Sequence, residues 1–322
     1  MTYSENDPGE NQTISGGFIL VGFSYLLDLQ ILLFLLLLVV YLLTLMGNLL
    51  VSLLIILNST LHTPMYFFLV NLSFLDVCFT TSVVPQVLVH LLVEEKTISI
   101  EGCVTQMYVY TIMGFTECCL LAAMSYDRYV AICHPLHYTT IMIRQVCAKL
   151  AGTSWTFGIS ASVVETMWLF SLPLCGSHYI HHFFCDIPPV MKKVCDDTTK
   201  MKIVGLTVSV LFLMVPFLMI LLSYVCILST ILKLPSAEGR RKAFSTCSSH
   251  LMVVTLFYGI SFFTYLVPKS TSTMERDQMI SLANSILAPM LNPLIYTLRN
   301  KEVKGAFRKT VGKCSFAHRW RN

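Results

Sequence analysis

Long apolar runs, each with at most one charged residue, alternate with short polar segments along the whole chain. A run of about 20 apolar residues is long enough to cross a bilayer core as a helix. Lipid offers backbone groups no hydrogen-bond partner, so each run is expected to be helical. The runs span 29–57, 64–93, 103–125, 150–174, 203–232, 243–267 and 279–298. The pattern therefore predicts an all-α fold, a seven-transmembrane helix bundle.

The composition also indicates a membrane protein. Of the 322 residues, 55% are hydrophobic and 12% are charged, and the mean hydropathy is +0.69. A soluble chain of this length carries about twice that share of charged residues. The formal charge of +4 is small, so we expect no nucleic-acid partner.

Basic residues indicate the orientation of the helices. If the N-terminus lies outside the cell, fifteen of the 22 Lys and Arg residues fall on the cytoplasmic side and seven fall outside. Lys and Arg accumulate on the cytoplasmic side of membrane proteins, so we expect an extracellular N-terminus and a cytoplasmic C-terminus. The expected parts are an extracellular tail over 1–25, a seven-helix domain over 26–299 and a cytoplasmic tail over 300–322.

Each tail carries a local signal. Residues 1–25 lack the basic start and short apolar core of a cleavable signal peptide, so the first helix is expected to act as its own anchor. A sequon places a glycosylation site at Asn11. In the C-terminal tail, apolar positions at helical spacing among basic residues predict a short amphipathic cytoplasmic helix on the inner leaflet. These positions are Val303, Ala306, Phe307, Thr310 and Val311. Cys314 follows them and is a weak candidate for palmitoylation.

Four of the twelve cysteines fall on the expected outer side: Cys103, Cys175, Cys185 and Cys195. An even number in an oxidising compartment predicts two disulfides. Four cysteines allow three pairings, and the spacing alone does not choose among them.

Four strings in the sequence are unusually specific. They are LHTPMY at 61–66, MSYDRYVAIC at 124–133, KAFSTC at 242–247 and PMLNPLIY at 289–296. Together they closely resemble the olfactory receptors, a branch of the rhodopsin-like G-protein-coupled receptors, and the overall pattern looks like the tetrapod-type class. Ser125 and Ser248 stand where the family usually has alanine, and both are small enough for a helix surface.

The resemblance implies an odorant receptor of the plasma membrane and not an enzyme. The implied partners are a small volatile odorant, the lipid bilayer and the olfactory stimulatory heterotrimeric G protein, with cyclic AMP as output. A receptor of the same fold for a hormone, lipid or nucleoside is the nearest alternative. A transporter or channel would show internal repeats or a charged pore, and an intramembrane enzyme would need a metal cluster or a nucleophile with its base. The sequence shows none of these.

The resemblance also implies how the outer cysteines pair. Cys103 is expected to bond Cys185, and Cys175 is expected to bond Cys195. The segment 182–186 is similar to one proposed to bind copper in some olfactory receptors. A cysteine in a disulfide cannot supply a thiolate, so ordinary loop packing is the favoured interpretation of that segment.

Two carboxylates, Asp76 and Glu117, each stand alone in an otherwise apolar run. Charges inside a membrane usually face the bundle interior, and the matching family positions face one another below the ligand pocket. Two nearby carboxylates repel, so either a sodium ion lies between them or one of them is protonated. A plain interhelical hydrogen bond is the alternative. We expect no other cofactor.

A switch for the G protein is implied where the third helix reaches the cytoplasm. The resemblance implies that Asp127 holds Arg128 in the silent state and that Arg128 meets the G protein when released. A snorkelling charge pair at a helix end is the simpler alternative. The residues assigned to this switch by resemblance are Asp127, Arg128, Tyr129, Tyr224, Asn292, Pro293 and Tyr296. Pro216 and Pro293 are expected to bend their helices.

The expected ligand pocket lies between the outer halves of helices 3, 5, 6 and 7, on the extracellular side. By helical spacing and by resemblance it comprises Tyr110, Thr111, Gly114, Phe115, Val208, Phe212, Tyr258, Ser261, Phe262, Tyr265, Leu282 and Ser285. The set is apolar and aromatic, with a few hydroxyls, and an aminergic receptor would need a carboxylate at Tyr110. Burying about 250 Å² at roughly 25 cal/mol/Å² gives about 6 kcal/mol before association costs, which predicts micromolar affinity or weaker. Glu165 is either part of this pocket or bonded to neighbouring Ser and Thr residues.

Overall fold

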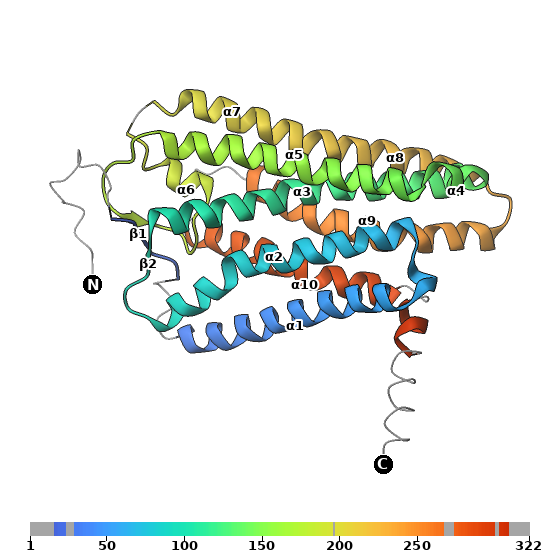
Figure 1. Ribbon diagram of the computed structural model, residues 1–322, viewed down its shortest axis with the longest axis horizontal. Helices are drawn as coiled ribbons and strands as arrows, with labels where there is room; N and C mark the ends of the chain where they lie inside the picture. The colour runs from blue at the N-terminus through green and yellow to red at the C-terminus, as the bar shows by residue number, and fades with distance from the viewer. Residues whose placement is uncertain (1–15, 24–28, 196, 267–273, 300–302, 309–322) are drawn as a thin grey trace, which may run out of the picture.

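The computed structural model describes residues 16–23, 29–195, 197–266, 274–299 and 303–308. Long helices run alongside one another and form an elongated bundle (Figure 1). The long elements are α1 (Gln30–Leu57), α2 (Pro64–Leu92), α3 (Ile100–Cys133), α5 (Arg144–Ser171), α7 (Thr199–Ser209), η4 (Val210–Met214), α8 (Val215–Lys233), α9 (Ala237–Leu266) and α10 (Met274–Arg299). The elements α7, η4 and α8 follow one another without a break, so the bundle has the seven rods that the apolar runs predict.

Six of the rods, within the described residues, are long and apolar enough to cross a membrane. The other rod is α5, which has 28 residues but is more polar because it includes Arg144, Lys149 and Glu165. Many apolar side chains of α1 point away from the bundle, and Ile31 is 73% exposed. Such an outer surface suits lipid and not water.

Several helices extend beyond the apolar runs. The run at 103–125 corresponds to α3, which begins at Ile100 and continues to Cys133. The side chain of Ser99 caps its first turn by accepting a hydrogen bond from the Gly102 amide at 3.0 Å, which satisfies one free N–H of the helix start. Helices therefore continue into the polar residues on both sides of the apolar core.

The fifth rod changes its hydrogen-bond pattern near Pro216. The segment η4 is a π-helix, in which the Val215 amide donates to the Val210 carbonyl. Proline cannot donate a backbone hydrogen bond and disrupts a regular helix. Where a bend was expected at Pro216, the structure has a π-turn just before the proline, which the sequence pattern did not predict.

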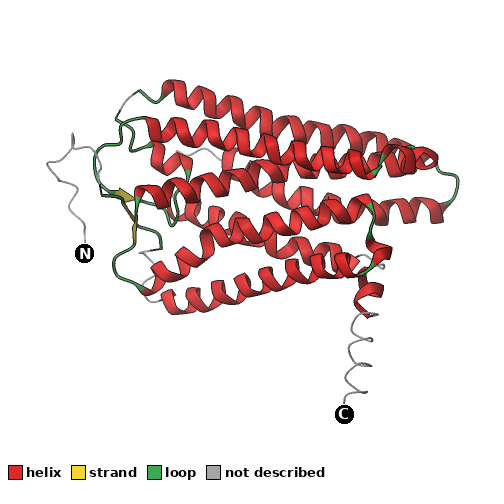
Figure 2. Ribbon diagram, in the orientation of Figure 1, coloured by secondary structure: helices red, strands yellow, loops and turns green. Residues whose placement is uncertain are grey.

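Three short strands lie together at one end of the bundle and are drawn yellow in Figure 2. β1 (Phe18–Leu20) pairs antiparallel with β2 (Thr97–Ile98) and parallel with β3 (Tyr179–Ile180). The prediction of an all-α fold is confirmed for the helix bundle. It did not include this small sheet. The strands are two or three residues long, too short to show an alternating pattern. We call this the sheet end of the bundle.

Two disulfides reinforce the sheet end. Cys103 at the start of α3 is bonded to Cys185, and Cys175 is bonded to Cys195. The first bond fixes α3 to the loop between α5 and α7, and the second closes that loop on itself. The loop contains the short helix α6 (Ile187–Met191) as well as β3.

The opposite end, where Asp127 and Arg128 lie, is called the Arg128 end. It carries the short helices η2 (Ser59–Leu61), η3 (Pro135–His137) and α4 (Tyr138–Ile141). Residues 303–308 form a further helical segment, in which Val303 and Ala306 are buried, as an amphipathic helix requires. Asn11, Thr310, Val311 and Cys314 lie outside the described residues.

Candidate functional site

An aromatic cluster joins α8 to α9 in the interior of the bundle. The ring of Phe217 lies 4.9 Å from that of Tyr258 and 4.9 Å from that of Phe262. Phe257 also contacts Tyr258, at 5.2 Å. Tyr258 and Phe262 were expected to line a pocket; Phe217 was not. The sequence offers one clue to Phe217, because it lies five positions after Phe212 in the same apolar run.

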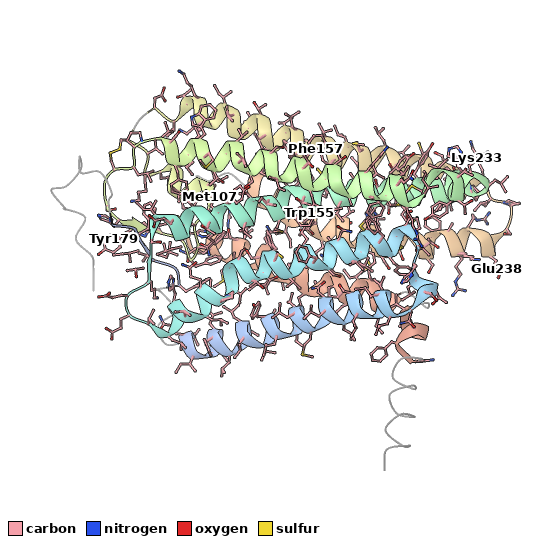
Figure 3. All side chains as sticks on the ribbon, viewed as in Figure 1. Met107, Trp155, Phe157, Tyr179, Lys233 and Glu238 are labelled. Atoms are coloured by element: carbon pink, nitrogen blue, oxygen red, sulfur yellow. A yellow bond between two sulfur atoms is a disulfide. The ribbon has the colours of Figure 1, made fainter. Side chains whose placement is uncertain are left out.

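A second aromatic contact joins α3 to η4. Phe115 and Phe212 are 5.4 Å apart, and Phe157 of α5, labelled in Figure 3, lies 6.2 Å from Phe212. Gly114 precedes Phe115, and a Cβ atom added there would meet nothing within 4 Å. The surface at Gly114 and Phe115 is therefore aromatic with open space beside it.

Tyr110 contacts a different part of the molecule. Its ring lies 4.7 Å from Phe79 of α2 and 4.8 Å from Phe184 of the loop that carries Cys185. The predicted pocket residues thus fall into two neighbouring groups. One group packs under the loop with Tyr110, and the other surrounds Phe212 and Tyr258.

Three hydroxyl groups of the predicted set are bonded within the protein. Thr111 donates to the Met107 carbonyl at 2.8 Å and contacts the Ser162 hydroxyl of α5 at 2.5 Å. Ser261 donates to the Phe257 carbonyl and Ser285 to the Ser281 carbonyl, each at 2.8 Å. The remaining surface is mainly apolar, which suits a ligand with few polar groups.

The last three members of the predicted set are placed as follows. Val208 on α7 and Leu282 on α10 are both 8% exposed. Leu282 belongs to a cluster with Phe23 and Phe183 beneath the sheet end. The side chain of Tyr265 lies outside the described part of the chain. Glu165 is buried on α5, one turn beyond Ser162.

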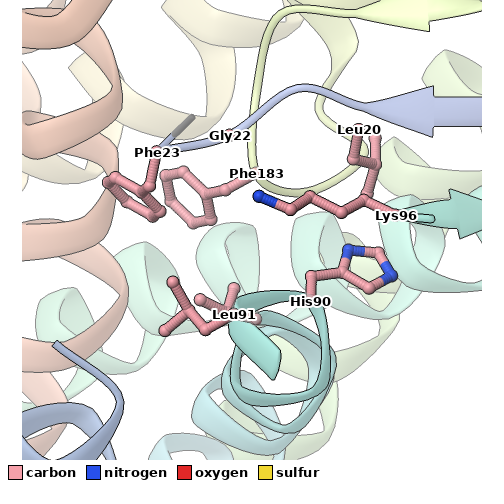
Figure 4. Close-up of a pocket in the computed structure, with 8 residues that line it drawn as sticks. Leu20, Gly22, Phe23, His90, Leu91, Lys96 and Phe183 are labelled. Carbon is pink, nitrogen blue, oxygen red and sulfur yellow. The ribbon is translucent and has the colours of Figure 1, made fainter. Parts of the chain in front are cut away.

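Two cavities lie beside these groups, and neither is lined by the predicted pocket residues. A cavity of about 10 Å³ lies beneath β1 between Phe23, Phe183, His90 and Lys96 (Figure 4). A larger groove of about 650 Å³ runs between α2 and α3. Burial lowers the pKa of the Lys96 ammonium group at the small cavity.

Below the aromatic groups, two carboxyl groups are buried around one amide. Asp76 is 0% exposed and Glu117 is 2% exposed. The amide nitrogen of Asn292 donates to both carboxylate oxygens of Asp76, at 3.1 Å each. Among the described residues, the Asn292 side-chain oxygen and one oxygen of Glu117 have no hydrogen-bond partner. Buried polar atoms are normally bonded, so these oxygens are suited to a cation, a water molecule or a proton.

At the Arg128 end, a single carboxylate holds two donors. The guanidinium of Arg128 forms an ion pair with Asp127, and its Nε donates to Asp127 Oδ2 at 3.1 Å. The Tyr138 hydroxyl donates to the other oxygen, Oδ1, at 2.7 Å. Burial, followed by the charge of Asp127, raises the pKa of the Tyr138 phenol, so the phenol remains a donor at neutral pH. Tyr138 from α4 was not predicted by the sequence.

A second polar contact links three helices nearby. His250 of α9 is 0% exposed. Its Nε2 lies 3.1 Å from the Leu121 carbonyl of α3, and its Nδ1 lies 2.8 Å from the Tyr224 hydroxyl of α8. A carbonyl only accepts, so Nε2 carries the proton and Nδ1 accepts from Tyr224. This contact and the Asp127 contacts hold α3, α4, α8 and α9 together; we call them the Arg128 latch.

The other residues expected in the switch lie close by but outside this set. Tyr296 of α10 is 1% exposed, and its hydroxyl makes no hydrogen bond with the described residues. Tyr129 contacts His134 at 3.1 Å. Pro293 lies inside α10 and against Gly47 of α1, where an added Cβ would be 3.1 Å from the proline ring.

Comparisons with known proteins agree with this architecture. The family model for olfactory receptors matches residues 37–313. Olfactory receptor 10A4 from Homo sapiens is 54% identical, over 94% of this chain and 96% of its own. Olfactory receptor 2K2 from Homo sapiens is 52% identical, over 95% and 96%. The structure of squid rhodopsin covers 86% of this chain and 83% of its own with a TM-score of 0.68 at 17% identity, which shows the fold. The chain is therefore a seven-helix, multi-pass membrane receptor that belongs to the olfactory receptor family.

Proposed function

We propose that this receptor binds small, mostly apolar volatile ligands among α3, η4, α8, α9 and α10. The observation that carries the proposal is the aromatic surface formed by Phe115, Phe212, Phe217, Tyr258 and Phe262, with open space at Gly114. These residues bear no charge, so they favour ligands with at most one or two polar atoms. The family of the chain supports the same ligand class.

The ligand acts by shifting a population between two states. A ligand changes such an equilibrium only by the difference in its affinity for the two states. Tyr258 lies on the same helix as His250, two turns nearer the sheet end, so a ligand that displaces Tyr258 also acts on α9 at the Arg128 latch. Opening of the latch frees Arg128 for the olfactory stimulatory G protein, and cyclic AMP rises.

This function requires the sheet end to be extracellular and the Arg128 end to be cytoplasmic at the plasma membrane. The distribution of Lys and Arg supports that orientation. The two disulfides at the sheet end support it as well, because disulfides persist in oxidising compartments.

We also propose that a sodium ion or a shared proton occupies the site between Asp76 and Glu117. The oxygens available there, from two carboxyl groups and the Asn292 amide, are ligands that hard cations prefer. A bound cation would hold α2, α3 and α10 together. Replacing Glu117 with Gln would then remove any dependence of ligand affinity on sodium concentration, whereas an interhelical hydrogen bond alone predicts no such dependence.

The experiment is a cyclic AMP assay in cells that express the receptor with the olfactory stimulatory G protein, screened against volatile compounds. The variant Arg128→Ala is expected to reach the surface and to lose the response. The matched control Arg144→Ala changes a basic residue at the start of α5, at the same end, and is expected to respond. A response that Arg128→Ala retains in full would contradict the proposed coupling.

The pocket is tested with the same assay. The variant Gly114→Leu fills the open space beside Phe115 and is expected to raise the half-maximal ligand concentration at least ten-fold. Gly152→Leu is the control, since an added Cβ there also meets nothing within 4 Å but α5 is outside the proposed pocket. Equal effects of the two variants would contradict the pocket's position.

A further inference from the structure

The groove between α2 and α3 is separate from the proposed ligand pocket. Its volume is about 650 Å³, and its wall includes Cys78, Thr81 and Ser82 of α2 and Glu101, Thr105 and Val109 of α3. Thr81, Glu101 and Thr105 are exposed, so the groove opens on the outer surface of the bundle. Figure 1 shows α2 and α3 side by side in this part. In a membrane this surface faces lipid.

The polarity of the groove changes along its length. Glu101 and Thr105 lie toward the sheet end, and Val77, Cys78 and Val109 lie deeper in the bundle. Glu101 and Val109 are eight positions apart, which corresponds to about 12 Å of helix at 1.5 Å per residue. The groove therefore fits a molecule with a polar group near the membrane surface and a compact apolar body directed toward the bilayer centre.

The backbone of α2 supplies a hydrogen-bond acceptor at this groove. Pro85 lies inside α2, and it has no N–H to donate to the Thr81 carbonyl one turn before it. The Thr81 hydroxyl contacts Tyr41 at 3.2 Å, and the next carbonyl, Ser82, accepts from Gln106 at 2.9 Å. Lipid tails offer the freed Thr81 carbonyl no donor, so a hydroxyl-bearing occupant is favoured.

The charge of the groove disfavours anionic lipids. Among the described residues that line it, Glu101 is the charged one and there is no Lys or Arg. A phosphate headgroup would meet the Glu101 carboxylate without a basic partner. A small volatile ligand would fill only part of the volume, because pockets of 300–1,000 Å³ enclose drug-sized molecules.

From this geometry we propose that the groove between α2 and α3 binds one membrane sterol. The sterol hydroxyl lies near the Thr81 carbonyl and Glu101, and the ring system packs on Val77, Cys78 and Val109. Gln106 connects this site to the sheet end, because its side-chain oxygen accepts from the Cys185 amide at 2.9 Å. A bound sterol therefore stabilises the packing of α2 and α3 beneath the disulfide-bonded loop. The proposal does not depend on the identity of the odorant.

The test uses the full-length receptor in phosphatidylcholine vesicles that contain a photoreactive cholesterol analogue. After illumination, mass spectrometry locates the adducts. We expect adducts concentrated in 77–82 and 101–109, and removed by excess cholesterol but not by excess cholesteryl acetate, whose hydroxyl is blocked. Adducts spread evenly over the lipid-facing helices would overturn the proposal, as would equal competition by cholesteryl acetate. Equal labelling of the groove by a photoreactive phosphatidylcholine would assign it to phospholipid instead.

Matched variants sharpen the test. Val109→Trp fills the deep part of the groove and is expected to reduce the adducts at least five-fold. Leu218→Trp adds the same side chain at a position of α8 that is 51% exposed, and is expected to leave them unchanged. Thr105→Phe, at an exposed position, provides a second filling variant whose folding is less at risk. Unchanged adducts in both filling variants, with surface expression retained, would place the sterol elsewhere.

Discussion

The two ends of the bundle are held together by different kinds of interaction. At the sheet end, two disulfides and a three-stranded sheet join the N-terminal segment and two loops to α3. At the Arg128 end, the corresponding connections are the hydrogen bond from Tyr138 to Asp127 and the His250 contacts, while the Asp127–Arg128 ion pair lies within α3. A covalent bond persists while the protein functions, whereas a hydrogen bond contributes only about 1 kcal/mol net and exchanges readily.

This difference indicates where the receptor can move. A ligand of micromolar affinity binds with about 8 kcal/mol in total, and allosteric coupling uses only about 1–3 kcal/mol of such energy. That free energy cannot separate the elements of the sheet end, which are joined covalently. It is comparable with the net free energy of the few hydrogen bonds in the Arg128 latch. We therefore expect the sheet end to remain fixed while the Arg128 end opens.

The largest expected effect is the loss of the disulfide that joins α3 to the loop. Cys103 and Cys185 are 82 residues apart in sequence, for which chain entropy predicts about 4.5 kcal/mol of stabilisation. For Cys175 and Cys195, 20 residues apart, it predicts about 3.3 kcal/mol. The variant Cys103→Ser is expected to lower surface expression and thermal stability more than Cys175→Ser. The free, exposed Cys226 provides the control Cys226→Ser, and an equally large loss there would contradict this assignment.

The next effect concerns the close contact of the N-terminal segment with the loop. At Gly22, an added Cβ would lie 2.4 Å from Phe183 Cβ and 2.5 Å from its Cα. Backbone atoms cannot move aside cheaply, so Gly22→Ala is expected to cost about 3 kcal/mol. Gly16→Ala is the control, because nothing lies within 4 Å there. Protease resistance of the N-terminal segment measures the difference, and equal resistance of both variants would refute it.

A pH dependence is expected at the sheet end from His182. Burial is the main cause that lowers its pKa to about 4, below the value of about 6.5 in an unfolded chain. The unfolded state then takes up the proton first as the pH falls, so stability is complete above pH 6.5 and is lost toward pH 4. Between pH 7 and pH 5 the loss is about 2 kcal/mol.

The measurement is thermal unfolding of the purified receptor at the two pH values. His182→Phe is expected to reduce the difference, since a phenyl ring keeps the stacking on Phe183 and the edge contact with Phe184 and does not titrate. An undiminished pH dependence in that variant would assign the effect to another group.

The smallest effect is expected at the Arg128 latch. Tyr138→Phe removes the hydrogen bond to Asp127 Oδ1, which is worth about 1 kcal/mol and corresponds to roughly a five-fold change in population. Ligand-free cyclic AMP is therefore expected to rise by up to that factor. Tyr126→Phe is the control, since Tyr126 is 38% exposed on the same end of α3. Unchanged basal activity of Tyr138→Phe would remove Tyr138 from the latch.

The bundle was predictable from the sequence because lipid imposes one simple rule on every segment that crosses it. The apolar runs therefore located the seven rods. Their ends were less predictable: α3 continues to Cys133 among charged residues, because a helix does not stop where the apolar core ends. The sheet was not predictable, since Ile19 pairs with Thr97 and with Tyr179, and such distant partners leave no local pattern.

The candidate sites show the same limit. Asp76, Glu117 and Arg128 were evident because a charge in an apolar run is conspicuous. His250 was not predicted, because a neutral histidine does not stand out in the apolar run at 243–267. Tyr138 and Phe217 are ordinary residues whose roles come from contacts with Asp127 and Tyr258. Thr111 was predicted from helical spacing, but the spacing did not show that its hydroxyl meets Ser162.

The most direct test of the difference between the two ends is fluorescence energy transfer across each of them. One pair of fluorophores is placed at Leu136, which is 90% exposed, and at Glu238, near the start of α9 (Figure 3). A second pair is placed at Glu101 and Tyr179, on the sheet end. A volatile ligand that raises cyclic AMP is expected to increase the first distance and to leave the second unchanged. A change at the sheet end with none at the Arg128 end would contradict the account.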